Sequence, residues 1–279
     1  MRYWRNELHS GRKADDPFFP ANAHIWREDE AGVVALCISE EGRQDLFVEV
    51  LPSHLEIYPS ILQWIECAWA LKRGGVEIDI FANDVRKLDL FTSAGYVFMK
   101  HSRNMRHYAL DRVDLSYSLE PGFSVRTFTE THDFAGRIAL LQNAFADPNY
   151  SERRLKGLLA TPTYEPDWDL MVLSSDGMPA SHCVGWRSPA KADSGSIEPV
   201  VTHSEYRRQG LAQVIVRECF QRMKAGGIKT VRIASVAEPA VGNFLYESLG
   251  PTSKQEVHRY RKAFQGTQIE AGLAGSSSV

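Results

Sequence analysis

One amphipathic helix, set between two β-rich segments, constrains the fold more than any other feature of the sequence. Residues 211–225 place apolar side chains at helical spacing on one side: Leu211, Val214, Ile215, Cys219, Phe220 and Met223. Gly226 and Gly227 end this helix, a strand is predicted before it over 195–202, and another is predicted after it over 228–236. A strand–helix–strand order of this kind favours a layered α/β fold.

Strands and helices alternate in the rest of the chain as well. In the first half the sequence predicts strands over 32–39, 45–50, 76–81 and 106–111, and helices over 59–73 and 84–94. In the second half it predicts strands over 124–129, 169–174, 180–188 and 257–262, and helices within 132–160 and over 239–249. Asp176 and Gly177 are typical of a hairpin turn between two of these strands. We therefore expect an α/β fold with a mixed sheet.

The length of the chain favours two domains. At about 150 residues per domain, 279 residues are enough for two. A polar connection near 112–122, which contains a proline and a glycine, is the predicted boundary. We predict an N-terminal arm over 1–22, a first lobe over 23–115, a second lobe over 120–264 and a disordered tail over 265–279.

Composition and charge exclude several classes of protein. The chain has 32 Lys and Arg against 35 Asp and Glu, so its formal charge is -3, which argues against a nucleic-acid binder that relies on bulk positive charge. No stretch reaches the roughly 18 apolar residues of a membrane span, and the first residues lack the apolar core of a secretory signal. The four cysteines lie far apart without a CxxC pair, so neither a disulfide framework nor a zinc site is expected. We expect a soluble, cytoplasmic protein.

The segment 200–212 carries the strongest chemical signal. It joins a predicted strand directly to the start of the amphipathic helix. A helix start leaves four backbone N–H groups unpaired and carries about half a positive charge. Gly210 and Ala212 have small side chains or none, which leaves room for a phosphate to approach the main chain. On these grounds the segment is either a pyrophosphate cradle or an ordinary strand–loop–helix junction.

The same segment resembles motif A of the GNAT N-acetyltransferase superfamily. That motif has Arg or Gln, two residues, Gly, one residue, and then Gly or Ala; Arg207, Gly210 and Ala212 occupy these positions. A second family element, Asn-x-x-Tyr-x-x-x-Gly, matches residues 243–250. The resemblance extends over nearly the whole second half of the chain. Pro251 departs from it, because the family usually has an aromatic residue there.

The resemblance implies a binding site for acetyl-CoA and an acid for catalysis. In the family, the fourth and fifth strands splay apart; the backbone of the fourth strand pairs with the pantetheine arm, and the loop amides bind the pyrophosphate. The residues of this chain at those positions, together with the matching asparagine, are Val200, Val201, Thr202, Arg207, Arg208, Gln209, Gly210, Leu211, Ala212 and Asn243. Tyr246 matches the tyrosine whose hydroxyl protonates the departing CoA thiolate. The alternative for Tyr246 is a core aromatic on a short helix.

An amine acceptor also needs a base, because a lysine-like ammonium with a pKa of about 10.4 must lose a proton before it attacks. Glu198 lies on the predicted fourth strand, where some members of the family place a catalytic glutamate, and its carboxylate could act directly or through a water molecule. A surface or structural role for Glu198 is the alternative. His182 and His203 are expected to be structural.

The first half repeats the order of elements of the second half without its chemical residues. Aligning the two strand–loop–helix junctions puts Leu55, Tyr58 and Ser60 at the three motif positions. Aligning the helices that follow puts Leu88 and Phe91 at the positions of the asparagine and the tyrosine. A tyrosine in place of the motif glycine would block a phosphate, and phenylalanine has no proton to donate. The first lobe is therefore predicted to be a degenerate acetyltransferase lobe, in tandem with an active one.

The sequence thus predicts transfer of an acetyl group from acetyl-CoA to a primary amine of a small molecule or peptide. We expect direct attack in a ternary complex, without a metal. No cysteine lies near the motif to form an acyl-enzyme, since Cys219 lies on the apolar side of the predicted helix. The alternative is a regulatory module that binds acetyl-CoA without turnover. The acceptor is not specified, because fold does not determine substrate.

Overall fold

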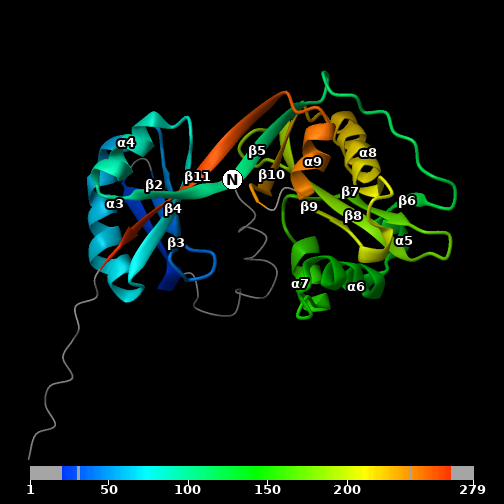
Figure 1. Cartoon of the computed structure of the whole chain (residues 1–279), viewed down its shortest axis with the longest axis horizontal. Helices are drawn as coiled ribbons and strands as arrows, with labels where there is room; N and C mark the ends of the chain where they lie inside the picture. The colour runs from blue at the N-terminus through cyan, green and yellow to red at the C-terminus, as the bar shows by residue number, and fades with distance from the viewer. Residues whose placement is uncertain (1–20, 30–31, 239–240, 265–279) are drawn as a thin grey trace, which may run out of the picture. The chain divides into compact units, whose positions relative to one another are not determined.

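The computed structural model describes residues 21–29, 32–238 and 241–264 (Figure 1). All but the last two residues of the predicted arm over 1–22, and all of the predicted tail over 265–279, lie outside this part of the chain. Within it, no helix is both long enough and apolar enough to cross a membrane.

The described chain forms two compact units. The C-terminal unit consists of Phe81–Asn83 and His101–His258. The N-terminal unit consists of the described residues within Pro20–Ile80, Asp84–Lys100 and Arg259–Val279.

The N-terminal unit is a small sheet with helices packed on it. Its strands lie side by side in the order β1 (Ala23–Glu28), β2 (Gly32–Ile38), β3 (Asp45–Val50) and β4 (Gly75–Phe81). The first three are antiparallel, whereas β3 and β4 are parallel. The helical elements are η1 (Leu55–Ile57), α3 (Tyr58–Trp64), η2 (Ile65–Trp69), η3 (Ala70–Lys72) and α4 (Val85–Ser93). Ile61 of α3, Ile78 of β4 and Phe91 of α4 share one core.

The C-terminal unit has a larger mixed sheet. The strand order is β5-β10-β9-β8-β7-β6. Their bounds are β5 (Val97–Ala109), β6 (Ser124–Thr127), β7 (Tyr164–Leu173), β8 (Pro179–Arg187), β9 (Ser194–Thr202) and β10 (Thr230–Val236). Only the β9–β10 pair of this set is parallel; the others are antiparallel. The last strand of the chain is β11 (Ser253–Ala263).

Helices cover both faces of this sheet (Figure 1). They are α5 (Phe128–Thr131), α6 (Phe134–Phe145), α7 (Glu152–Leu159), η4 (Ser204–Tyr206), α8 (Leu211–Ala225) and α9 (Val241–Ser248). On β7, Leu170 belongs to the core that contains Phe220 of α8, whereas Met171 belongs to the core that contains Leu141 of α6. Because successive strand residues point to opposite faces, α8 and α6 pack on opposite sides of the sheet.

The predicted α/β class with a mixed sheet is confirmed, and several element predictions need correction. The predicted strands over 169–174 and 257–262 start too late, since β7 begins at Tyr164 and β11 at Ser253. The strand β1 was not predicted. The predicted strand over 124–129 ends at Thr127, because Thr127 and Glu130 form a capping box that starts the short helix α5. The predicted strand over 106–111 is longer at its start, since β5 begins at Val97.

The compact units divide the chain differently from the predicted lobes. Residues 103–109 of β5, expected in the first lobe, pair with β10 in the C-terminal unit. The end of β11, from Arg259 onward and expected in the second lobe, belongs to the N-terminal unit. Strand pairing between distant segments, rather than the polar connection near 112–122, decides these unit boundaries.

Candidate functional site

The parallel strands β9 and β10 part in the middle of the C-terminal unit. They pair only where Ser194–Ser196 lies beside Thr230–Arg232, and beyond Ser196 no further pair joins them in the described chain. Parted strands present backbone N–H and C=O groups that need partners. An extended ligand can supply them as an added strand would.

The backbone of β9 faces this gap at alternate residues. The N–H of His203 donates to Ala180 of β8 at 2.9 Å, and the Val201 carbonyl accepts the Ser181 hydroxyl at 2.7 Å. Because backbone groups alternate in direction along a strand, those of Val200 and Thr202 face the gap. Of the three predicted strand residues, Val201 therefore directs its main chain toward β8 instead.

A β-bulge turns β9 beside the gap. Gly185 of β8 lies opposite Ile197, but Cys183 lies opposite Val200, so β9 has one extra residue in between. The bulge contains Glu198, whose carbonyl accepts the indole N–H of Trp186 at 2.6 Å. The Glu198 residue is exposed. The bulge thus fixes the backbone at Glu198 while its carboxylate stays accessible.

The loop between β9 and α8 has the backbone geometry of an anion site. Arg208 and Gly210 have left-handed backbones with φ of 67° and 77°, and Gln209 between them does not. Alternation of this kind turns successive N–H groups toward one side. Gly210 caps α8 without a side-chain hydrogen bond, and a Cβ added to it would meet nothing within 4 Å. The start of α8 is therefore open to a ligand.

The side chains of the loop are exposed, whereas the helix behind it is anchored. Arg207, Arg208 and Gln209 are exposed, and Leu211 is buried in the core under α8. Arg207 Nε donates to the Thr202 carbonyl at 3.3 Å, which ties the loop back to the end of β9. The ring of His203 accepts the N–H of Glu205 at 3.4 Å, a local cap consistent with a structural role.

Tyr246 of α9 and Glu198 act on each other electrostatically. The ring of Tyr246 packs against the core beneath α8. Burial, and after it the nearby Glu198 carboxylate, raise the pKa of Tyr246 to about 12 against the opposing charge of Arg106. The hydroxyl is therefore protonated at neutral pH and can donate a hydrogen bond.

Asn243 binds its own chain in this structure. Its Oδ1 accepts hydrogen bonds from Arg106 at 2.9 Å and Ser235 at 2.7 Å, and its Nδ2 donates to the carbonyls of Val236 and Ala237. These bonds hold the start of α9 at the end of β10. The cofactor contact predicted for Asn243 stays a prediction.

Arg106 is a site-shaping residue that the sequence did not reveal. It lies on β5, its side chain is 1% exposed, and its guanidinium donates to Glu247 and Ser235 as well as to Asn243. It holds α9, and with it Tyr246, against the sheet. An arginine in an alternating strand gives no sign of burial, since its partners lie far away in the sequence.

A second buried polar group lies on the α6 side of the sheet. Asp169 is paired with Arg137 at 2.5 Å, and it accepts hydrogen bonds from His182 at 3.0 Å and Tyr164 at 2.8 Å. Burial alone would raise the pKa of Asp169, but the Arg137 charge and these hydrogen bonds hold it below its ordinary value. Burial and Arg137 lower the pKa of His182, so its ring is neutral at pH 7.

Metal and disulfide chemistry have no visible basis in the described chain. Its residues form no cluster of three or more His, Cys, Asp or Glu side chains that could hold a metal ion. All four cysteines are free, and Cys219 is buried on α8.

The comparisons with known proteins agree with the resemblance seen in the sequence. Residues 138–250 match the family model described as Acetyltransferase (GNAT) family. No curated protein matches the chain. The match covers most of the C-terminal unit, including both parted strands, the loop and α9, so the predicted GNAT membership is confirmed for this segment.

Solved structures share the fold over most of the chain. A GCN5-related N-acetyltransferase from Sphaerobacter thermophilus is 20% identical, with a TM-score of 0.65 over 88% of this chain and 82% of that one. A tandem GNAT protein from the clavulanic acid biosynthesis pathway is 14% identical, with a TM-score of 0.68 over 93% and 87%. A GNAT-family acetyltransferase from Colwellia psychrerythraea is 9% identical, with a TM-score of 0.61 over 91% and 97%. At these low identities the TM-scores show a common fold and no more, and the degeneracy of the first lobe stays a prediction.

Proposed function

We propose that this chain, whose residues 138–250 form a GNAT-family domain, transfers an acetyl group from acetyl-CoA to a primary amine by direct attack in a ternary complex. The observation that carries the proposal is the gap between β9 and β10, which leads directly to the open start of α8. An extended thioester arm fits the gap, and a pyrophosphate fits the helix start.

The backbone supplies most of the binding. Amides of Arg208–Ala212 would hold the pyrophosphate, because the alternating backbone and the helix dipole both favour negative charge there. Val200 and Thr202 would pair with the amides of the pantetheine arm, since their backbone groups face the gap, and the exposed Arg207 side chain would release the Thr202 carbonyl when the arm binds. The exposed arginines of the loop add positive charge to the same place.

Tyr246 supplies a hydrogen-bond donor for the leaving group, and Glu198 supplies a base for the acceptor. The Tyr246 hydroxyl, held neutral by burial, would donate to the sulfur as charge develops on the departing thiolate. Glu198 would take a proton from the incoming ammonium, directly or through a water molecule, because its exposed carboxylate lies on the bulge beside the gap. A base and an acid that act on each other electrostatically can serve the two ends of one transfer.

An amine panel tests the proposal. Purified full-length protein is incubated with acetyl-CoA and a set of small amines and lysine peptides, and the release of free CoA thiol is followed. Amine-dependent release is expected, and Glu198→Gln should lower it while leaving acetyl-CoA binding unchanged. Glu205→Gln, a change at an exposed glutamate on η4, is the matched control and should have little effect. Calorimetric binding of acetyl-CoA with no release for any amine would favour the regulatory module instead.

The choice of acyl group is tested in the same assay. Acetyl-CoA is compared with propionyl-, butyryl- and octanoyl-CoA at equal concentration. The proposal expects the highest ratio of kcat to KM for the acetyl group. If a longer acyl-CoA reacts faster, the proposed transfer reaction stands, but that acyl-CoA replaces acetyl-CoA as the donor.

A further inference from the structure

The N-terminal unit contains a second pair of parting parallel strands. β3 and β4 pair only where Asp45 lies beside Glu77 and Leu46 beside Ile78. A helical segment over 58–72 follows β3, and α4 follows β4, in the same order in which α8 and α9 follow β9 and β10. The place that would correspond to a cofactor site therefore lies between the start of α3 and α4.

Side chains of the N-terminal unit fill most of that place. Lys87 Nζ donates to the Val48 carbonyl at 2.8 Å, so the lysine takes a backbone acceptor of β3. Tyr58 at the start of α3 is buried and packs edge-on against Phe91, with 6.3 Å between ring centroids. Pro59 has no N–H, which removes one donor from the helix start. These contacts support the prediction that the first lobe is degenerate.

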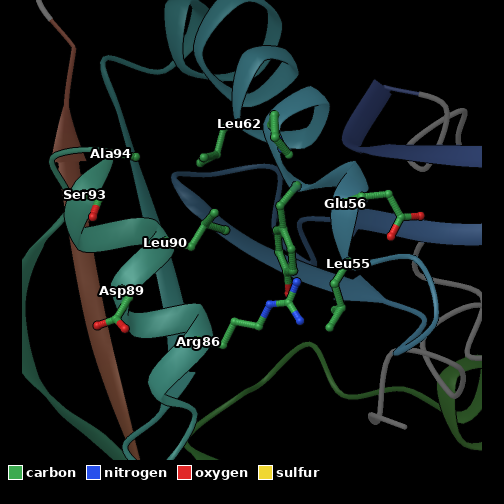
Figure 2. Close-up of a pocket in the computed structure, with 10 residues that line it drawn as sticks. Leu55, Glu56, Leu62, Arg86, Asp89, Leu90, Ser93 and Ala94 are labelled. Atoms are coloured by element: carbon green, nitrogen blue, oxygen red, sulfur yellow. The ribbon is translucent and has the colours of Figure 1, made fainter.

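A groove of about 650 Å³ remains between α3 and α4 (Figure 2). Most of its lining is apolar: Leu55, Tyr58, Pro59, Leu62, Leu90 and Ala94. A volume and lining of this kind are typical of sites for small molecules that are largely apolar.

The charge that enters the groove is positive. Figure 2 shows Arg86 reaching from α4 across toward η1, whereas Glu56 and Asp89 point away from the groove. Arg86 is exposed, and no hydrogen bond or ion pair joins its guanidinium to another residue of the described ranges. A guanidinium matches the two oxygens of a carboxylate with two parallel N–H donors.

We infer that this groove binds a small amphipathic carboxylate, with the apolar chain against Leu62 and Leu90 and the carboxylate on Arg86. Burial, and after it the carboxylates of Asp84 and Glu49, raise the pKa of the Tyr58 hydroxyl to about 12, against the opposing charge of Arg86. That hydroxyl therefore stays protonated and can donate to the same carboxylate. The site belongs to the N-terminal unit alone and holds whether or not the C-terminal unit transfers acyl groups.

Calorimetric titration of the full chain with octanoate and with octylamine tests the site. Wild type should bind octanoate more tightly than octylamine. Arg86→Glu should weaken octanoate binding at least about fivefold, because it removes an ion pair that contributes up to about fivefold and also places a like charge beside the carboxylate; it should strengthen octylamine binding. Arg86→Lys should keep most of the octanoate affinity. Arg43→Glu changes an exposed arginine of the same unit outside the groove and should alter neither affinity.

Two results would overturn the inference. One is equal octanoate binding by wild type and Arg86→Glu, which would put the carboxylate elsewhere. The other is tighter binding of octylamine than of octanoate by wild type, because Glu56 and Asp89 rather than Arg86 would then select the ligand. Neither Arg86→Glu nor Arg43→Glu changes the C-terminal unit. Any octanoate that binds in the gap between β9 and β10 therefore contributes equally to the binding measured for both variants. If Arg86→Glu does not fold, Arg86→Gln gives the same comparison through loss of charge.

Discussion

Replacing Tyr246 by phenylalanine separates its hydroxyl from its packing. The ring lies against the core beneath α8, and phenylalanine keeps that contact. The main chain of Tyr246, which accepts the Tyr108 hydroxyl at 2.8 Å, is also retained. Acetyl-CoA affinity should therefore change little, and the loss should fall on kcat.

The raised pKa sets the size of that loss. A free thiol has a pKa of about 8.5, so complete proton transfer from a phenol with a pKa of about 12 is uphill by roughly 5 kcal/mol. Tyr246 therefore acts mainly as a hydrogen-bond donor to the charge that develops on sulfur. A hydrogen bond to a charged group contributes about 1.5–3 kcal/mol, which corresponds to a roughly 10- to 150-fold loss of kcat.

Single-turnover and steady-state rates of Tyr246→Phe, measured with one good amine, give the result. Tyr117→Phe is the matched control, because that hydroxyl bonds Glu218 on the exposed side of α8 and should leave kcat unchanged. A loss below about threefold in Tyr246→Phe would mean that the hydroxyl does not meet the sulfur. If kcat of wild type falls near pH 10 and this fall disappears in Tyr246→Phe, burial does not raise the pKa of Tyr246.

Three further predictions use other parts of the chain. In wild type, calorimetry should show one acetyl-CoA site per chain, and Gly210→Tyr should abolish it. Gly177→Tyr, the control at another open glycine with positive φ, should retain it. Two acetyl-CoA sites in wild type would refute the prediction of a degenerate first lobe. Asp169→Asn should lower the free energy of unfolding by about 3–5 kcal/mol, because it leaves a buried guanidinium without its counter-charge, while the exposed Asp176→Asn should cost little. Since the folded pKa of Asp169 is depressed, this stabilisation is present above about pH 3.9 and is lost as pH falls further, which denaturant titrations in acid will show. A fragment of residues 120–279 should fail to give a cooperative melting transition, because it lacks β5, the strand that pairs with β10. A stable fragment as active as the whole chain would leave the first lobe without a role.

The sequence alone was sufficient for the features that depend on neighbouring residues. Apolar spacing predicted α8, the glycines after it predicted its end, and the Asp-Gly turn predicted the β7–β8 hairpin. The loop over 207–212 was also singled out from its own residues, by the small side chains at a helix start and by the resemblance to motif A; the structure then shows Gly210 in a left-handed conformation that glycine adopts without strain. These signals are local, so a single sequence displays them.

The tertiary structure decided what depends on residues far apart in the chain. The parting of β9 from β10, the bulge at Glu198 and the pairing of β5 with β10 are properties of strand register, which no short segment specifies. Arg106 and Glu247 meet across 141 positions, and a buried charge is tolerated only when such partners converge on it. The sequence could thus propose the loop and the tyrosine of the candidate site. Which side chains hold them together, and which backbone groups face the gap, followed only from the folded sheet.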